Sequence, residues 1–174
     1  MELFEREDVD RLLRLLAQRL DAAGVSGTIS LVGGAAISLQ YLFDRDSTTD
    51  IDALLPQSPI VAEIIHDIAV QENLDSGWIN DAAKAYIPFE TIDMWVDIFA
   101  IGGIAIRVAS AELLLAMKLK ADRGLRDRGD IEGLLGLIGV HSLEEVKEIF
   151  EKYHHQEILK ESTCLMVEQI LSNA

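Results

Sequence analysis

The stretch LVGGAAISLQYLFDRDSTTDID, residues 31–52, decides the fold of this chain. It begins at the end of GTISLV, a short apolar and β-branched run over residues 27–32 that predicts a buried strand. Gly33 and Gly34 end that strand, and AAISLQYLF predicts a helix directly after them. STTDIDALLP then alternates from one residue to the next, which predicts a second strand ending at Pro56.

Two carboxylates on the second strand give this arrangement its chemistry. Asp50 and Asp52 are two residues apart, so on a strand they point to the same face. Like charges this close repel unless a cation lies between them, and Mg²⁺ often takes one or two carboxylates together with substrate phosphates. Gly33 and Gly34 leave backbone N–H groups open at a helix start, which suits a phosphate. The combination predicts metal-assisted phosphoryl or nucleotidyl transfer; the alternative is a solvated strand face.

The order of these motifs resembles the DNA polymerase β-like nucleotidyltransferase superfamily, in which a strand ending in GG is followed, after a helix, by T-x-D-I-D. GWINDAAK (77–84), VASAELLLAMKLKA (108–121) and RDRGDIEGLL (126–135) are similar to its AbiEii-like bacterial branch, which includes toxins of toxin–antitoxin systems. The resemblance covers roughly residues 28–153. It implies an α+β nucleotidyltransferase-like fold, a nucleoside triphosphate (NTP) substrate, Mg²⁺ or Mn²⁺, and transfer of a nucleotidyl group to a protein, RNA or small-molecule acceptor. An antitoxin partner is also implied.

The resemblance assigns roles to residues of this chain. It implies that Gly33, Gly34 and Thr49 contact the triphosphate and that Asp50 and Asp52 hold the metal.

The superfamily has a third carboxylate on a nearby strand, where it activates the acceptor hydroxyl. Asp97 is the candidate for this third catalytic and metal-binding carboxylate, and Asp93 is the second choice. Both lie on one face of the strand predicted by the alternation of TIDMWVDIFA, residues 91–100. The alternative for Asp97 is an exposed carboxylate on an edge strand.

The rest of the pattern predicts a small mixed α/β core at residues 1–109 and a helical region at 110–174 packed on it. Within the core, helices are predicted at about 7–23 and 59–73, a loop over 75–88, and a hairpin at Gly102-Gly103 that leads into the strand IAIRV. Ser110 predicts the cap of the first helix of the second region. Ser142 and Glu145 predict a capping box at the start of a later helix.

Charge is unevenly distributed along the chain. The formal net charge is −15, yet residues 107–128 carry six basic side chains against three acidic ones. A basic segment in an acidic chain suits a compact anion, so Lys118 and Arg126 are predicted to contact substrate phosphate in the same cleft as the Asp50 pair. The alternatives are a solvated helix, an exposed pair between Lys118 and Asp122, and Asp127 as a helix N-cap.

Composition excludes several classes of protein. Cys164 is the single cysteine, which excludes an internal disulfide. No apolar run is long enough to span a bilayer, and the acidic N-terminal stretch lacks a signal-peptide pattern, so we expect a cytoplasmic protein without a membrane partner. Two functions remain: a nucleotidyltransferase, or a non-catalytic module that keeps the fold to bind a nucleotide or a partner.

Overall fold

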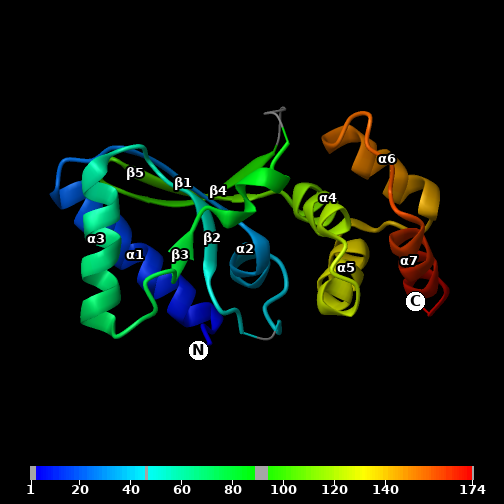
Figure 1. Ribbon diagram of the computed structural model, residues 1–174, viewed down its shortest axis with the longest axis horizontal. Coiled ribbons are helices and arrows are strands. Elements are labelled where there is room, and N and C mark those ends of the chain that lie inside the picture. Colours follow the sequence, from blue (N-terminus) through cyan, green and yellow to red (C-terminus); the bar gives the residue numbers. More distant parts are fainter. Residues whose placement is uncertain (1–2, 46, 89–93, 174) are drawn as a thin grey trace. The chain divides into compact units, whose positions relative to one another are not determined.

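The computed structural model describes residues 3–45, 47–88 and 94–173. Contacts between Cα atoms divide the chain into two compact units. The first unit consists of Met1–Lys84 and Trp95–Ala109, and the second of Ala85–Met94 and Ser110–Ala174. Helices and strands are labelled in Figure 1. The chain has an α+β fold, as the sequence predicts.

The first unit contains one mixed sheet of five strands in the order β3-β2-β1-β5-β4. β1 and β2 are antiparallel, β1 and β5 are parallel, β2 and β3 are parallel, and β4 and β5 form an antiparallel hairpin. The strands are β1 Gly27–Val32, β2 Ile51–Leu54, β3 Ile79–Asn80, β4 Trp95–Ile101 and β5 Ile104–Ala109. The predicted neighbours β1 and β2 are therefore adjacent, with Val32 opposite Asp52.

The two faces of the sheet differ in chemistry. One face carries the apolar core, with Ile29, Leu31 and Ile106 fully buried. The register places the side chains of the other face in line across the strands, from Arg107 through Ser30 to Leu54 and from Asp52 to Asn80. We call this second face the polar sheet face; it carries Ser30, Asp52, Asn80, Trp95, Asp97 and Arg107.

Three α-helices accompany the sheet: α1 Arg6–Ala22, α2 Gly33–Gln40 and α3 Pro59–Glu72. α1 buries its apolar stripe completely, and its Arg14 lies over the ring of Phe99, which shares the apolar sheet face with Ile106. Pro59 opens α3, as expected for a residue whose missing N–H costs nothing in the first turn. A short 3₁₀-helix, η1 Ala82–Tyr86, follows β3.

The second unit contains α4 Ala111–Ala121, α5 Leu125–Ile138, α6 Leu143–Tyr153 and α7 Glu161–Asn173. Ser110 caps α4 by accepting a hydrogen bond from the Leu113 amide, as predicted. The capping box of Ser142 and Glu145 is also confirmed. The alternative of Asp127 as an N-cap is wrong, because α5 begins after Gly124 and Asp127 lies in its first turn.

Two further differences concern the first unit. The segment 75–88, predicted to be a loop, contributes β3, which pairs with β2 through only two residues. The predicted strand over residues 91–100 is observed from Trp95 onward, and Asp93 lies outside the described residues. No helix in the described part of the chain is long and apolar enough to cross a bilayer.

Candidate functional site

The end of β1 brings a glycine against an aspartate. Gly33 has a φ of +68°, a backbone conformation that L side chains rarely adopt. A Cβ atom added to Gly33 would lie 2.5 Å from Oδ2 of Asp52, because Asp52 pairs in register with the preceding Val32. The Asp52 carboxylate lies directly beside the start of α2, and for this reason only glycine fits at position 33.

The N-terminus of α2 has no side-chain cap from its N-cap residue, Val32. Its first turn also contains no acidic residue, so the N–H groups at this end are not satisfied by a side chain of the helix itself. A Cβ atom on Gly34 would meet Nη2 of Arg45 at 2.8 Å and Oγ1 of Thr48 at 3.1 Å. A helix N-terminus next to a guanidinium and a hydroxyl offers the donors that phosphate oxygens require.

Asp50 is held from two sides. The Thr49 hydroxyl donates to its Oδ1 at 3.1 Å, and the Asn80 amide donates to its Oδ2 at 3.0 Å. Asn80 is itself fixed, because its Oδ1 accepts a hydrogen bond from the Ala82 amide. Thr49, predicted to contact triphosphate, thus contacts the carboxylate of Asp50. The sequence did not reveal the support from Asn80, which depends on the pairing of β2 with β3.

The donor set fits a magnesium ion that binds together with its substrate. Among residues 3–45, 47–88 and 94–173, no three His, Cys, Asp or Glu side chains are grouped so that they could hold a metal. Asp50 and Asp52 are the two carboxylates of this region, and Mg²⁺ commonly uses one or two carboxylates and completes its shell with water and phosphate oxygens.

Asp97 does not complete this set, which corrects the prediction of a third ligand. It lies on the polar sheet face, as Asp52 does, but on β4, with β5 and β1 between it and β2. Three strand spacings of roughly 4.8 Å and an offset of two residues along the strands separate the two backbones by about 16 Å, too far for one metal ion. The sequence could not show this, because alternation predicts the face of a strand and not its place in the sheet.

A comparison with protein families now adds to this geometry. Residues 7–168 match the family described as "Nucleotidyltransferase of unknown function (DUF6036)". The chain belongs to this family. The match supports the predicted membership of the nucleotidyltransferase superfamily, while the AbiEii-like branch stays a prediction. No curated protein and no solved structure matches this nucleotidyltransferase-family chain.

Lys118 of this family member has carboxylate partners within the second unit. Its Nζ lies 2.6 Å from Oδ1 of Asp127 and 2.8 Å from Oδ2 of Asp130, and all three side chains are at least nine-tenths buried. The alternative of an exposed pair with Asp122 is wrong, since Asp122 pairs instead with Lys160 and Thr163. Hydrogen bonds from Thr163 and Lys160 hold the pKa of Asp122 below its usual value.

Arg126, the other basic residue predicted to contact phosphate, is exposed in the first turn of α5. The side chains of Lys118 and Arg126 thus differ: one is buried in an ion-pair cluster, and the other is accessible to an anion in solution. Contact of either with a substrate phosphate stays a prediction.

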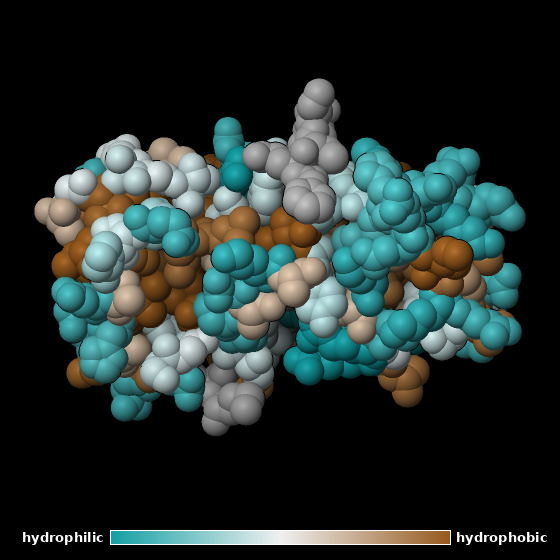
Figure 2. Space-filling view, turned by 45° about the horizontal axis from the view of Figure 1, so that its top comes forward, coloured by the Kyte–Doolittle hydropathy of each residue, from teal (hydrophilic) through white to brown (hydrophobic). Residues whose placement is uncertain are grey.

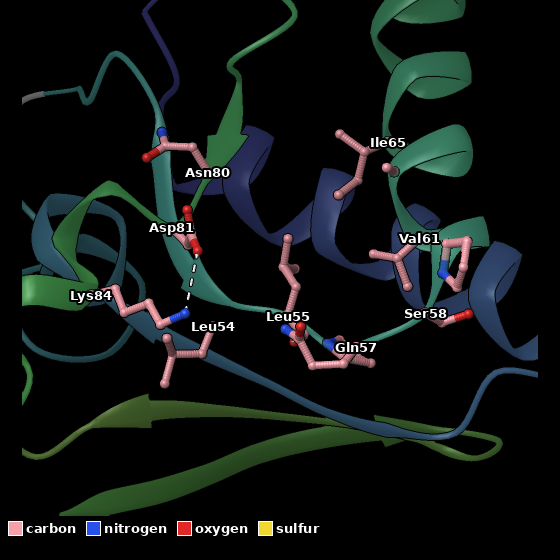
Figure 3. Close-up of a pocket in the computed structure, with 12 residues that line it drawn as sticks. Leu54, Leu55, Gln57, Ser58, Val61, Ile65, Asn80, Asp81 and Lys84 are labelled. Atoms are coloured by element: carbon pink, nitrogen blue, oxygen red, sulfur yellow. Dashed lines mark hydrogen bonds and ion pairs between the residues drawn. The ribbon is translucent and has the colours of Figure 1, made fainter. Parts of the chain in front are cut away.

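A groove of about 900 Å³ adjoins the Asp50 side of the site in the first unit. Its walls are apolar, with Leu54 from β2 and Val61 and Ile65 from α3, and Asn80 lies at its border (Figure 3). Figure 2 shows apolar surface gathered on the part of the first unit that carries α3. Because Asn80 both borders the groove and donates to Asp50, a molecule in the groove would contact the residue that holds the Asp50 carboxylate.

Proposed function

We propose that the protein is a Mg²⁺-dependent nucleotidyltransferase that transfers a nucleotidyl group from an NTP to an acceptor. The observation that carries this proposal is the contact of Asp52 with Gly33 at the uncapped N-terminus of α2, beside the supported carboxylate of Asp50. The Asp52 carboxylate thus lies beside the first amides of α2, and a metal-bound phosphate requires carboxylates for the cation and N–H donors for the anion. Membership of a nucleotidyltransferase family agrees with this reading.

In this reaction an acceptor oxygen bonds to the α-phosphorus of the NTP, the bond from that phosphorus to the β-phosphate oxygen breaks, and pyrophosphate leaves. Mg²⁺, when bound, supplies positive charge to the phosphate oxygens. Asp50 and Asp52 would hold the ion, with Asn80 and Thr49 fixing the orientation of Asp50. The α2 amides at Gly33 and Gly34 would orient the triphosphate.

The groove beside Asn80 offers a place for the part of the acceptor that does not react. Its apolar walls fit an apolar portion of a protein or small molecule, and its opening carries Asp81 and Lys84, which pair with each other at 3.9 Å. A protein acceptor, or a partner antitoxin as in the AbiEii-like branch, would use this surface better than a polyanion, because the net charge of the chain is −15.

Mass spectrometry tests the proposed reaction. The protein is incubated with Mg²⁺, each of the four NTPs, and candidate protein, RNA and small-molecule acceptors. We expect one acceptor to gain the mass of one nucleotidyl group, and we expect Asp50→Asn/Asp52→Asn to abolish the gain. Glu63→Gln/Asp67→Asn is the matched control, because it removes the same charge from exposed positions of α3 and should keep the activity.

NTP binding without any modified acceptor would support the second function, a non-catalytic nucleotide-binding module. The absence of a third carboxylate beside Asp50 and Asp52 among the described residues is the observation that favours this alternative. Equilibrium dialysis with and without Mg²⁺ separates it from a protein that binds no nucleotide at all.

A further inference from the structure

An arginine at the centre of the polar sheet face is held in a fixed position. Arg107 of β5 donates from Nε to Oγ of Ser30 at 2.7 Å, and Ser30 is 2% exposed. Its guanidinium also lies over the ring of Trp95, 4.5 Å from the ring centroid. A hydroxyl on one side and an aromatic ring on the other restrict the side chain, so that less conformational entropy is lost when it binds a ligand.

In the part of the chain that the structure describes, this arginine has no carboxylate partner. Asp97 lies directly opposite it in the β4–β5 register, yet within the described ranges Arg107 forms no ion pair with it or with any other acid. Arg14 makes a useful comparison, because it also lies over an aromatic ring, that of Phe99, but pairs with Asp10 at 2.7 Å. A half-buried arginine that no described acid neutralises keeps its positive charge for an anion, even though the chain as a whole carries a net charge of −15.

The position of Arg107 relates it to the candidate metal site. Arg107 and Asp52 share the polar sheet face, with only β1 between their strands. Two strand spacings of roughly 4.8 Å and an offset of two residues along the strands put their backbones about 12 Å apart, a distance that a long arginine side chain shortens. A phosphate of a substrate bound at Asp50 and Asp52 is therefore within reach.

We propose that Arg107 binds a phosphate group of the substrate on the polar sheet face, with Ser30 and Trp95 fixing its guanidinium. This inference rests on the proposed function for the identity of the substrate, whose phosphate belongs either to the NTP or to a phosphorylated acceptor. Arginine suits the task better than lysine, because its planar group offers two parallel N–H donors to phosphate oxygens.

Titration calorimetry with inorganic pyrophosphate in EDTA tests the inference without metal, nucleotide or turnover. We expect saturable binding that Arg107→Gln weakens at least tenfold and Arg107→Lys weakens less. Arg14→Gln is the control and should bind like the wild type. In the wild-type protein, tryptophan fluorescence should change on binding, since Trp95 is half-buried whereas Trp78, the second tryptophan, is 1% exposed.

The outcomes separate this inference from the proposed function. Asp50→Asn/Asp52→Asn should retain pyrophosphate binding in EDTA even though it abolishes nucleotidyl transfer. Failure of the proposed transfer activity therefore does not imply failure of phosphate binding by Arg107. Unchanged pyrophosphate affinity in a folded Arg107→Gln protein, or no saturable binding by the wild type, overturns the inference. If Arg107→Gln does not fold, the pyrophosphate affinities of Arg107→Lys and Arg107→Ala are compared at low temperature. Equal affinities of these two variants would then overturn the inference.

Steady-state kinetics then identifies the source of the phosphate. A KM for NTP raised at least tenfold by Arg107→Gln, with the KM for the acceptor unchanged, assigns the phosphate to the NTP. The reverse pattern assigns it to the acceptor. Unchanged values of both KM constants and of kcat would contradict a role in substrate binding.

Discussion

At the scale of single residues, Gly33 has both a left-handed backbone and a close contact with Asp52, whereas Gly24 has only the left-handed backbone and serves as a control. Gly33→Ala places a Cβ 2.5 Å from the Asp52 carboxylate in a left-handed backbone, whereas Gly24 has a similar φ of +74° with nothing within 4 Å of its Cβ position. Both substitutions should cost about 1–2 kcal/mol of unfolding free energy through backbone strain. Only Gly33→Ala should also displace Asp52 and weaken NTP binding with Mg²⁺. Urea unfolding measures the loss of stability, and equilibrium dialysis measures the NTP affinity. Equal NTP affinity in both variants would contradict a nucleotide site at Gly33 and Asp52.

Lys118 is the residue for which the structure changes the expected result most. As an exposed lysine it would be removable with little cost, but its ammonium lies between two buried carboxylates. Lys118→Ala removes the buried cation between Asp127 and Asp130, so we expect a loss of about 3–5 kcal/mol in unfolding free energy, although Arg123 still lies 3.5 Å from Asp127. Lys120→Ala, at an exposed pair with Glu157, should cost less than about 1 kcal/mol.

Urea unfolding distinguishes these variants. Similar stability of Lys118→Ala and Lys120→Ala would show that the buried cluster is not needed for folding. Any role of Lys118 in binding phosphate is then measured by dialysis at a temperature at which the variant is folded.

At the scale of elements, α6 links the stability of the second unit to pH. His154, the C-cap of α6, is 4% exposed, and burial followed by the charge of Lys120 lowers its pKa below the ordinary value of 6.5, although Glu157 acts in the opposite direction. The unfolded chain therefore binds the proton first as the pH falls. We expect stability to be highest above pH 6.5 and to fall between 6.5 and the lower pKa of the folded state.

The measurement compares urea unfolding of the wild type and His154→Gln at pH 7.5 and 5.5. The wild type should lose more stability on acidification, because the variant lacks this histidine and keeps the others. Equal losses would show that the pKa of His154 is the same in the folded and unfolded chains.

Elements with their own local signals could be predicted from the sequence. β1 matches its predicted range of 27–32, and the Gly102-Gly103 hairpin and the capping box of α6 are confirmed. β3 could not be predicted, because two residues show no alternation and depend on the edge of β2 for their pairing. The strand order also has no local signal: β5 pairs with β1, which places Asp97 far from Asp52 and brings Arg107 to Ser30. The sequence singled out the two glycines and the two aspartates as candidates, but it did not predict the hydrogen bond from Asn80 to Asp50.

At the scale of the whole molecule, the net charge of −15 complicates any test with a cation. Repulsion among so many acidic groups destabilises the folded chain, so any salt should raise the melting temperature by screening. A site at Asp50 and Asp52 adds a separate effect, since an ion that binds only the folded state stabilises it by mass action. The melting temperature must therefore be compared in MgCl₂ and in NaCl at equal ionic strength.

We expect Mg²⁺ with NTP to raise the melting temperature of the wild type beyond the NaCl value. Asp50→Asn/Asp52→Asn should lose this excess, whereas Glu63→Gln/Asp67→Asn, which reduces the negative charge equally, should keep it. Without metal, Asp50→Asn/Asp52→Asn (the site variant) should be at least as stable as the wild type, because two neighbouring like charges are removed. Each asparagine retains one oxygen to accept a hydrogen bond, so Asp50→Asn keeps a partner for either Thr49 or Asn80. A site variant that melts earlier without metal, together with a wild type that responds equally to both salts, would show that the carboxylates hold the fold together rather than an ion.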